Sequence, residues 1–597
     1  MKKLLFAFAV LTCQFLSAQF VPQTPYSANE TDPQWIQLLS VDAPNVLEVR
    51  SAFDQWRAAN PEVKNQHTQY YKRWMRTFQT SMDAHGNAIA PIPPQVRWKQ
   101  NIEQRNRPQS GNWEEMGPWQ FDAEVAMSFN VQSPGACHVY TVEQAPSNPD
   151  VVWCGTATAG IWKSTDKGLH WQLMSRELPI TSVYSIAIDP LDENTVYFGQ
   201  GYGTIWKTTD GGQNWALTGD QDFENIGLWV RDLKITPDDN NVLLAATDNG
   251  LYRSEDAGLT WNNVQAGEHM EIEFHPTNPQ MIYAVRLTAN QTLLKRSENG
   301  GTTWATVGAA TWPFPQVGEE QKRCEISVSP AEPDNVYVLA SGNADGFGGL
   351  FGIYKSTDMG DTFAYQCCGT GPGGEPAIDT NPNLLGWSEG GEGDGGQYYY
   401  DLASAVSPTD PELMYAAGIN VWRSEDSGSS WILNGHWVTW AGEFTQDRYT
   451  HADVHDIKFF QHDNGVDMWI ASDGGLFYSS DQGEHIEPRM YGLHGTDFWG
   501  WQSGFKQGDV MVGGTYHNGT LIRNGDVYPF GLDNEEAGGW LAELGGDNFR
   551  GFVNPGDASI GYHDGGSFNF SDDRWTRITS RTFDNSKRPN TSYWWGE

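Results

Sequence analysis

Short stretches that alternate between apolar and polar residues recur along most of the chain. Residues 184–190 (YSIAIDP) and 230–237 (VRDLKITP) alternate and end on proline, and a second apolar stretch follows each after a turn, at residues 195–199 and 242–246. Alternation with a period of two is typical of β-strands that bury one face. The pattern therefore predicts pairs of short strands joined by tight turns.

A turn motif, Ser/Thr-x-Asp-x-Gly-x-x-Trp, follows these strand pairs seven times, and each copy is termed a box turn below. Asp and Ser side chains bond to nearby backbone groups in tight turns, Gly adopts conformations that other residues avoid, and Trp packs the turn onto a sheet. We therefore interpret the motif as structural. Its acidic position is held by Asp166, Asp210, Asp256, Asn299, Asp358, Asp426 and Asp481, and its last position by Phe363 in the fifth copy and Ile486 in the seventh.

Each repeat holds four short strands in about 45 residues, which is the size of a β-propeller blade. The sequence thus predicts an all-β fold, a β-propeller of four-stranded blades over residues 112–597. Residues 497–530 and 545–575 are expected to form two further, decayed blades, which makes about nine. Whether these form one large ring or two smaller rings stays open. The chain reaches Glu597 without a closing element, which fits a truncated chain.

The box turns resemble those of the Asp-box (BNR) propeller superfamily. Over residues 112–575 the pattern is similar to sortilin-type receptor domains and to two-propeller xyloglucanases. Residues 155–164 (GTATAGIWKS) and 451–455 (HADVH) resemble stretches of large exported Bacteroidota proteins, for which type IX secretion is expected. The resemblance implies the fold and says little about function. A sialidase of this superfamily would need an Arg-Ile-Pro-type signature before the first box turn, and this sequence has no such tripeptide.

The first residues read as an export signal followed by a helical segment. Lys2 and Lys3 precede a mostly apolar stretch, and Ser17-Ala18 offers a cleavage site, so residues 1–18 are predicted to be a secretory signal peptide. This predicts a secreted or cell-surface location. Residues 19–111 are expected to form a helical lead segment with helical stretches at 35–59 and 65–82. No later stretch is long and apolar enough to predict a membrane span.

The net charge limits which partners the chain can bind, and the cysteine count limits which disulfides it can form. The chain carries 37 Lys and Arg against 75 Asp and Glu, a net charge of −38. Such an acidic surface repels phosphate, which argues against nucleic acid as a partner. We expect no cofactor. Apart from Cys13 in the signal there are five cysteines, so at least one thiol stays unpaired within the chain. Cys137 and Cys154 could pair, and the vicinal Cys367 and Cys368 could either bond to each other or remain two loop thiols.

By analogy with the family, insertions after the box turns all lie on one face of a propeller. The long ones, residues 305–323, 364–400 and 432–452, are expected to carry the site, because binding often resides in loops on a rigid scaffold. Aromatic side chains beside carboxylates suit sugars, although a stiff acidic cover explains residues 390–396 better. The predicted ligand-binding residues are Trp387, Tyr399, Trp437, Trp440, Tyr449, His451, His455, Trp499 and Trp501.

Residues 451–456 (HADVHD) lead into a predicted inner strand. If the strand is extended, His451, Asp453 and His455 share one side of it and could bind zinc or another divalent ion. A hydrogen-bonded polar plug in the channel is the interpretation we favour, so no metal is expected. The Asp473-Gly-Gly sequence predicts a turn.

Three kinds of function fit these features. We favour a non-catalytic exported propeller that binds a glycan or an extracellular protein. The alternative is a glycoside hydrolase similar to the xyloglucanases, which would need two carboxylates across a cleft. A purely structural surface component needs no site at all. The candidate catalytic carboxylates are Asp401, Asp453, Asp456 and Glu443.

Overall fold

The computed structural model divides the chain into two compact units, Met1–Ser110 and Gly111–Glu597. No helix among the described residues is long and apolar enough to cross a membrane. The signal region, Trp440 and Glu443 lie outside the described residues. The structure describes residues 31–41, 44–61, scattered positions between 63 and 87, and 116–121, 133–180, 182–201, 203–219, 229–344, 347–369, 382–393, 395–438, 448–504, 510–524, 540–543, 546–548, 551–553, 560–563, 566–571 and 574–578.

In the first unit the structure bounds two helices, α1 (Gln34–Leu39) and α2 (Val46–Ala59), where the sequence predicted one stretch over residues 35–59. Several described positions between 68 and 78 are helical as well. Pro44 disfavours helical backbone in the residue before it, and Asn45 caps the second helix by accepting from the N–H groups of Leu47 and Glu48, each at 3.1 Å. Aromatic side chains fill a small separate core: Trp35, Phe53, Tyr71, Trp74 and Phe78.

The second unit contains nine antiparallel four-stranded sheets among its described residues, each built from consecutive strands, which confirms the predicted blades. The first seven are β1 (Val139–Gln144), β2 (Val152–Thr156), β3 (Ile161–Ser164), β4 (Gln172–Leu173); β5 (Ser185–Asp189), β6 (Asp192–Gly199), β7 (Ile205–Thr208), β8 (Ala216–Leu217); β9 (Val230–Thr236), β10 (Asp239–Thr247), β11 (Gly250–Ser254), β12 (Asn262–Ala266); β13 (His269–Phe274), β14 (Ile282–Leu287), β15 (Thr292–Ser297), β16 (Ala305–Thr306); β17 (Glu320–Val328), β18 (Val336–Ala344), β19 (Phe347–Ser356), β20 (Ala364–Cys367); β21 (Ala403–Val406), β22 (Met414–Ala417), β23 (Val421–Ser424), β24 (Ile432–Gly435); and β25 (Val454–His462), β26 (Gly465–Ser472), β27 (Gly475–Ser479), β28 (Glu487–Pro488).

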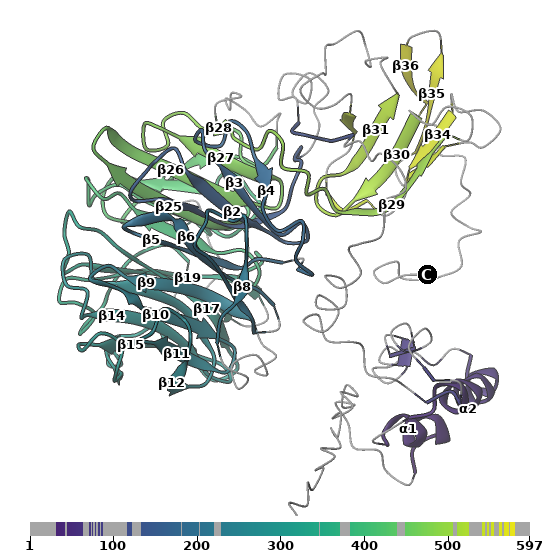
Figure 1. The fold of residues 1–597 in the computed structure, drawn as a ribbon, viewed down its shortest axis with the longest axis horizontal. Helices are drawn as coiled ribbons and strands as arrows, with labels where there is room; N and C mark the ends of the chain where they lie inside the picture. The colour runs from purple at the N-terminus through teal and green to yellow at the C-terminus, as the bar shows by residue number, and fades with distance from the viewer. Residues whose placement is uncertain are drawn as a thin grey trace, which may run out of the picture. The chain divides into compact units, whose positions relative to one another are not determined.

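These seven sheets form one closed ring, a seven-bladed β-propeller in which β25–β28 pack beside β1–β4 (Figure 1). The second strand of a blade is buried on both sides, as in β2, because neighbouring blades cover both of its faces. The fourth strands are short and mostly exposed, as in β4 and β16.

Acidic side chains of the innermost strands link blade to blade. In three places such a carboxylate accepts a hydrogen bond from the backbone N–H of the next innermost strand. At the seam between the seventh and first blades, Lys458 also lies 2.6 Å from Glu143 and 3.0 Å from Asp456. The ring therefore closes with the same kind of contact that joins the third blade to the fourth and the fourth to the fifth. The carboxylate and N–H pairs are Asp232 with Ile272 (2.9 Å), Glu271 with Ile326 (2.8 Å) and Asp456 with Val142 (3.3 Å).

The two remaining sheets follow the ring as the eighth and ninth blades. The glycine at Gly551 lets β33 approach the backbone of Val512 in β30 closely, so these two blades pack on each other. The first seven blades therefore close into one ring without the last two. The strands of the last two are β29 (Phe498–Ser503), β30 (Val510–Thr515), β31 (Thr520–Asn524), β32 (Trp540–Glu543), β33 (Gly551–Val553), β34 (Ile560–His563), β35 (Gly566–Ser571) and β36 (Arg574–Ile578).

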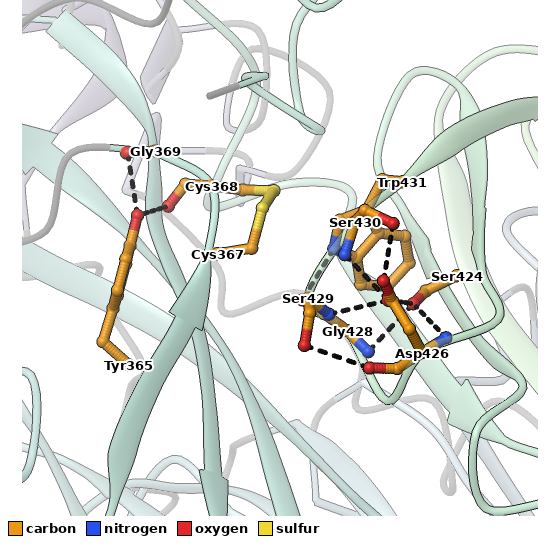
Figure 2. Close-up of a disulfide and its surroundings, with 10 residues drawn as sticks. All are labelled: Tyr365, Cys367, Cys368, Gly369, Ser424, Asp426, Gly428, Ser429, Ser430 and Trp431. Atoms are coloured by element: carbon orange, nitrogen blue, oxygen red, sulfur yellow. Dashed lines mark hydrogen bonds between the residues drawn. A yellow bond between two sulfur atoms is a disulfide. The ribbon is translucent and has the colours of Figure 1, made fainter. Parts of the chain in front are cut away.

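Each of the seven box turns joins the third strand of a blade to the fourth. In the sixth, Ser424 Oγ donates to Asp426 Oδ1 at 2.8 Å and accepts from the N–H of Gly428 at 2.9 Å (Figure 2). Ser427 and Gly428 both have left-handed backbone, with φ of 59° and 86°, which explains the glycine. Ser430 donates to the Asp426 carboxylate through its N–H and its hydroxyl. The turn is therefore satisfied by its own side chains.

The cysteines use one of the two predicted pairings. Cys367 and Cys368 form a vicinal disulfide at the end of β20, beside the sixth box turn, and the Tyr365 hydroxyl donates to the Cys368 carbonyl at 3.1 Å (Figure 2). The other possible pair does not form: Cys137 and Cys154 are free and buried, as is Cys324. Burial raises the pKa of the Cys137 and Cys154 thiols well above its usual range.

Candidate functional site

The predicted loops converge on one face of the propeller, termed the entry face, which is the face on which the innermost strands begin. The three long insertions each connect a fourth strand to the next innermost strand, that is β16 to β17, β20 to β21 and β24 to β25. The hairpins between second and third strands reach the same face, whereas the box turns lie on the opposite face. The expectation that the insertions share one face is therefore correct.

A buried polar cluster lies at this face around Asp473, which occupies the β26–β27 turn and is 0% exposed. Its Oδ1 lies 2.6 Å from His455 Nε2 and 2.9 Å from His138 Nε2. Its Oδ2 lies 2.8 Å from His517 Nδ1, and the Tyr400 hydroxyl donates to it at 3.1 Å. These five residues are termed the Asp473 cluster.

The cluster joins segments that are far apart in the chain. His138 directly precedes β1, His455 is the second residue of β25, Tyr400 precedes β21, and His517 lies in the β30–β31 turn of the eighth blade. The turn at Asp473 packs tightly because Gly474 has no side chain: a Cβ there would lie 2.1 Å from the ring of His451. The turn was predicted from sequence, but the environment of Asp473 was not.

Burial and neighbouring charges shift the pKa values of three groups in the cluster. Burial raises the pKa of Asp473, but the fields of His138, His517 and His455 outweigh it and hold that pKa well below its usual range. Burial lowers the pKa of His517, but the Asp473 carboxylate outweighs this and raises it. For His455 burial prevails, and its pKa is lowered. These shifts favour the carboxylate form of Asp473, the protonated form of His517 and the neutral form of His455.

Two predicted catalytic carboxylates lie close to this cluster. Asp453 accepts a hydrogen bond from Gln397 at 2.8 Å, and burial, reinforced by the charge of Asp473, raises its pKa to about 7. Asp401 is 1% exposed, and neither of its carboxylate oxygens has a hydrogen-bond partner among the described residues. Burial, then the charges of Asp453 and Asp473, raise the pKa of Asp401 well above its usual range. Its environment therefore favours the protonated form of Asp401.

His451, Asp453 and His455, the alternative to the favoured polar plug, do not assemble as a metal-binding set. Asp453 has left-handed backbone, with φ of 61°, and β25 begins only at Val454, so the three residues do not alternate along one extended strand. His451 is buried behind the turn, with Nδ1 3.0 Å from the Ala452 carbonyl. Of the three, His455 belongs to the cluster, where it lies 2.6 Å from Asp473, and Asp453 lies beside it. The structure instead places His138, Asp473 and His517 where their ligand atoms lie within 4.8 Å of one another.

The predicted aromatic residues occupy different environments. Trp387 is 50% exposed and contacts Trp437 edge-on, with ring centroids 5.4 Å apart, so two long loops meet there. Tyr399 is 66% exposed, beside the half-buried Tyr400. Tyr449, in contrast, is buried in the core, and its hydroxyl donates to the Pro134 carbonyl at 2.6 Å. It therefore offers no surface to a ligand.

On the eighth blade, strand β29 exposes Trp499 and Trp501. Trp499 stacks on Tyr516, with ring centroids 4.8 Å apart, and Tyr516 contacts the ring of His517. Trp499 is thereby connected to the Asp473 cluster. Asp456, a predicted catalytic candidate, faces the seam of the ring instead, where it binds Thr141 and Lys458. Its role in this structure is to hold neighbouring blades together.

A row of stacked rings was missed by the sequence reasoning. Trp229, 43% exposed, stacks on Tyr184 with centroids 5.0 Å apart, and Tyr184 stacks on Tyr140 at 4.7 Å. Tyr140 then contacts the ring of His455 edge-on at 5.0 Å. Their positions in the sequence could have revealed two of these rings. Tyr184 and Trp229 each directly precede an innermost strand and therefore lie at the entry face.

These features define the chain as a seven-bladed β-propeller with two additional blades and a polar cluster at its entry face. No family model matches the sequence, and no curated protein matches it. Among solved structures it is similar to a GH74 xyloglucanase from Xanthomonas campestris, with 16% identity over 75% of this chain and 74% of that one, and a TM-score of 0.48.

A GH74 enzyme from Niastella koreensis is similar at 15% identity over 75% and 73% of the two chains, with a TM-score of 0.43. YCF48 from Cyanidioschyzon merolae is similar at 13% identity over 59% and 98% of the two chains, with a TM-score of 0.40. Similarity at this level concerns the propeller architecture alone.

Proposed function

We propose that this chain is an exported β-propeller that binds a carbohydrate at its entry face. The main support comes from one loop of the entry face. Residues 382–400 present Trp387 and Tyr399 to solvent at 50% and 66% exposure, while Gln397 and Tyr400 of the same loop bind Asp453 and Asp473. Exposed rings held by a rigid polar anchor suit sugars, whose apolar faces stack on aromatic rings while their hydroxyls bond to acids.

Export is supported by two features. The sequence begins with the pattern of a secretory signal, and Cys367 and Cys368 are disulfide-bonded. Disulfides persist in oxidising compartments such as the periplasm and the cell exterior. Fractionation of the producing cells tests this part: the mature protein is expected to begin near Gln19 and to lie outside the cytoplasm. An unprocessed cytoplasmic protein would contradict it.

Binding is tested with purified protein against a panel of β-glucans that includes xyloglucan, which the name of one structural neighbour mentions. We expect retention of at least one glycan, and roughly five-fold weaker binding for each of Trp387→Ala and Tyr399→Ala, since one stacking contact contributes about 1 kcal/mol. Phe552→Ala is the matched control, because Phe552 is 47% exposed on the ninth blade. Loss in the control as well, or binding to none of the panel, would contradict the proposal; retention of a protein instead would identify a protein partner.

A glycoside hydrolase is the second candidate, and the observation that favours it is Asp401. A buried carboxyl with two unpartnered oxygens is costly and recurs at functional sites. Reducing ends are therefore measured in parallel with binding. Release that disappears in Asp401→Asn and Asp453→Asn, with folding intact, would establish hydrolysis at this face. Retention without release supports the binder.

A further inference from the structure

The Asp473 cluster contains more imidazole groups than an ion pair requires. Nitrogen atoms of three histidines, His138, His455 and His517, lie 2.9, 2.6 and 2.8 Å from the one Asp473 carboxylate. His138 is directed at the carboxylate: its side chain is 3% exposed, and Nε2 lies 2.9 Å from Asp473 Oδ1. Among the described residues neither ring nitrogen of His138 makes a hydrogen bond with proper geometry. His138 thus faces the carboxylate without a well-aligned hydrogen bond, and a buried polar group in that state calls for a further partner.

We propose that His138, Asp473 and His517 bind one Zn²⁺ ion. The donor atoms of these three residues lie within 4.8 Å of one another, and the rings of His138 and His517 are nearly perpendicular, with centroids 4.9 Å apart. Two imidazoles and a carboxylate are a donor set that zinc accepts, usually with water as the fourth ligand. The proposal does not depend on carbohydrate binding.

The surrounding groups match what a zinc site requires. Ligating histidines usually hydrogen-bond through their second nitrogen, and ligating carboxylates are themselves hydrogen-bonded. The second nitrogen of His517, Nε2, lies 3.3 Å from the Tyr400 hydroxyl. Asp473 is held by His455 at 2.6 Å and by Tyr400. We therefore assign His455 and Tyr400 as positioning residues and not as ligands.

The site would have a structural consequence. His138 belongs to the segment that enters the first blade, Asp473 to the seventh blade and His517 to the eighth. An ion bound by all three would connect the two blades at the ring seam to the eighth blade. Zinc binding is therefore expected to raise the thermal midpoint of the wild-type chain, because an ion that binds only the folded state stabilises it.

The experiment measures zinc binding to the full chain after chelation and dialysis, by calorimetry in competition with a chelator and by metal analysis. Wild type is expected to bind about one Zn²⁺ per chain. His138→Gln and His517→Gln are expected to lose the stoichiometric site, and His455→Gln to bind about 10–100-fold more weakly, as outer partners do. His275→Gln is the matched control, because His275 is also buried and lies beside a carboxylate, 3.7 Å from Asp334.

Absence of zinc binding in the folded wild type would overturn the proposal and leave an ion-paired plug. Unchanged binding in both His138→Gln and His517→Gln would overturn it as well. If these variants fail to fold, X-ray absorption of the zinc-loaded wild type decides instead. Nitrogen and oxygen ligands with two imidazoles support the site, whereas sulfur ligands would assign the ion to the buried thiols of Cys137, Cys154 or Cys324 and contradict it.

Discussion

Trp171 of the first box turn donates its indole N–H to the backbone carbonyl of Arg489, 2.8 Å away and 318 residues later in the chain. Arg489 follows β28 directly, in the last blade of the ring. Trp215 of the second box turn makes the same contact with Met174, which follows β4 in the same way, at 3.0 Å. The seam of the ring therefore reproduces a contact used between consecutive blades.

Removing the Trp171 side chain is expected to destabilise the ring. Trp171 is 8% exposed, so Trp171→Ala leaves a cavity at the seam and should lower the free energy of unfolding by about 3–5 kcal/mol. Trp171→Phe keeps most of the packing and should cost about 1 kcal/mol for the lost hydrogen bond. Denaturant unfolding measures both. Trp501→Ala, at a 59% exposed position, should stay within about 0.5 kcal/mol. Equal effects at the two tryptophans would contradict the role of Trp171.

The fourth box turn indicates how the others respond to substitution. Asn299 occupies the acidic position there and still accepts from the N–H of Thr303 at 2.9 Å, while its amide donates to the Thr303 hydroxyl at 2.8 Å. In the third box turn Asp256 accepts both bonds from Thr260. Asp256→Asn should therefore cost less than about 0.5 kcal/mol, whereas Asp256→Ala should cost about 1–2 kcal/mol.

Thermal unfolding of the two Asp256 variants checks this. Similar losses in both variants would mean that the negative charge of Asp256 matters and not its hydrogen-bond geometry. A larger loss for Asn than for Ala would contradict the comparison with Asn299 outright.

Asp401 is expected to make the protein less stable as the pH rises. Its pKa in the folded state is raised well above that of the unfolded chain, where it is about 3.9. Between these two values the folded state holds a proton that the unfolded state has released, so stability falls with increasing pH. Asp401→Asn removes this dependence. The thermal midpoint of the variant, relative to wild type, should rise from pH 5 to pH 8.

The control for Asp401 is Asp463→Asn, at an exposed position in the turn between β25 and β26. Its midpoint relative to wild type should stay constant over the same range. A relative midpoint of Asp401→Asn that does not change with pH would show that Asp401 is ionised in the folded protein.

Thiol titration of the denatured mature protein distinguishes the cysteine states. The structure has three free cysteines and one disulfide, so three thiols should react without reductant and two more after reduction. One reactive thiol before reduction would mean that Cys137 and Cys154 also pair, and five would mean that the vicinal pair is reduced. Replacing Cys367 by Ser should add one reactive thiol, that of Cys368, before reduction.

The sequence pattern predicted the blades well because blades are local structures. The alternation around Ile186 and the box turn at Asp166 each depend on residues within a few positions, through pleat periodicity and side chain to backbone hydrogen bonds. In the lead segment one helical stretch was predicted over residues 35–59, and the break before Asn45, which caps the second helix, was not recognised. Tyr449 was expected at the surface because it is aromatic and lies in a predicted loop, but the loop packs it into the core.

The candidate site could be predicted only in part. The face was correct, since topology determines which connections share it, and Asp401, Asp453 and His455 do lie at or near the cluster. His138 and His517 were missed because no spacing relates them to Asp473, which lies 335 positions from one and 44 from the other. Left-handed backbone at Asp453 also broke the alternation on which the His451 set depended.

By itself, the sequence determined the strand pairs, the box turns, the four-stranded blade and the face that bears the long loops, because short-range periodicity and turn chemistry specify each of these. Only the tertiary structure decided that seven blades close, that Trp171 meets Arg489, and that one buried carboxylate gathers three histidines. Those outcomes depend on how blades pack across hundreds of residues, and packing between distant segments leaves no periodic mark on the residues that take part.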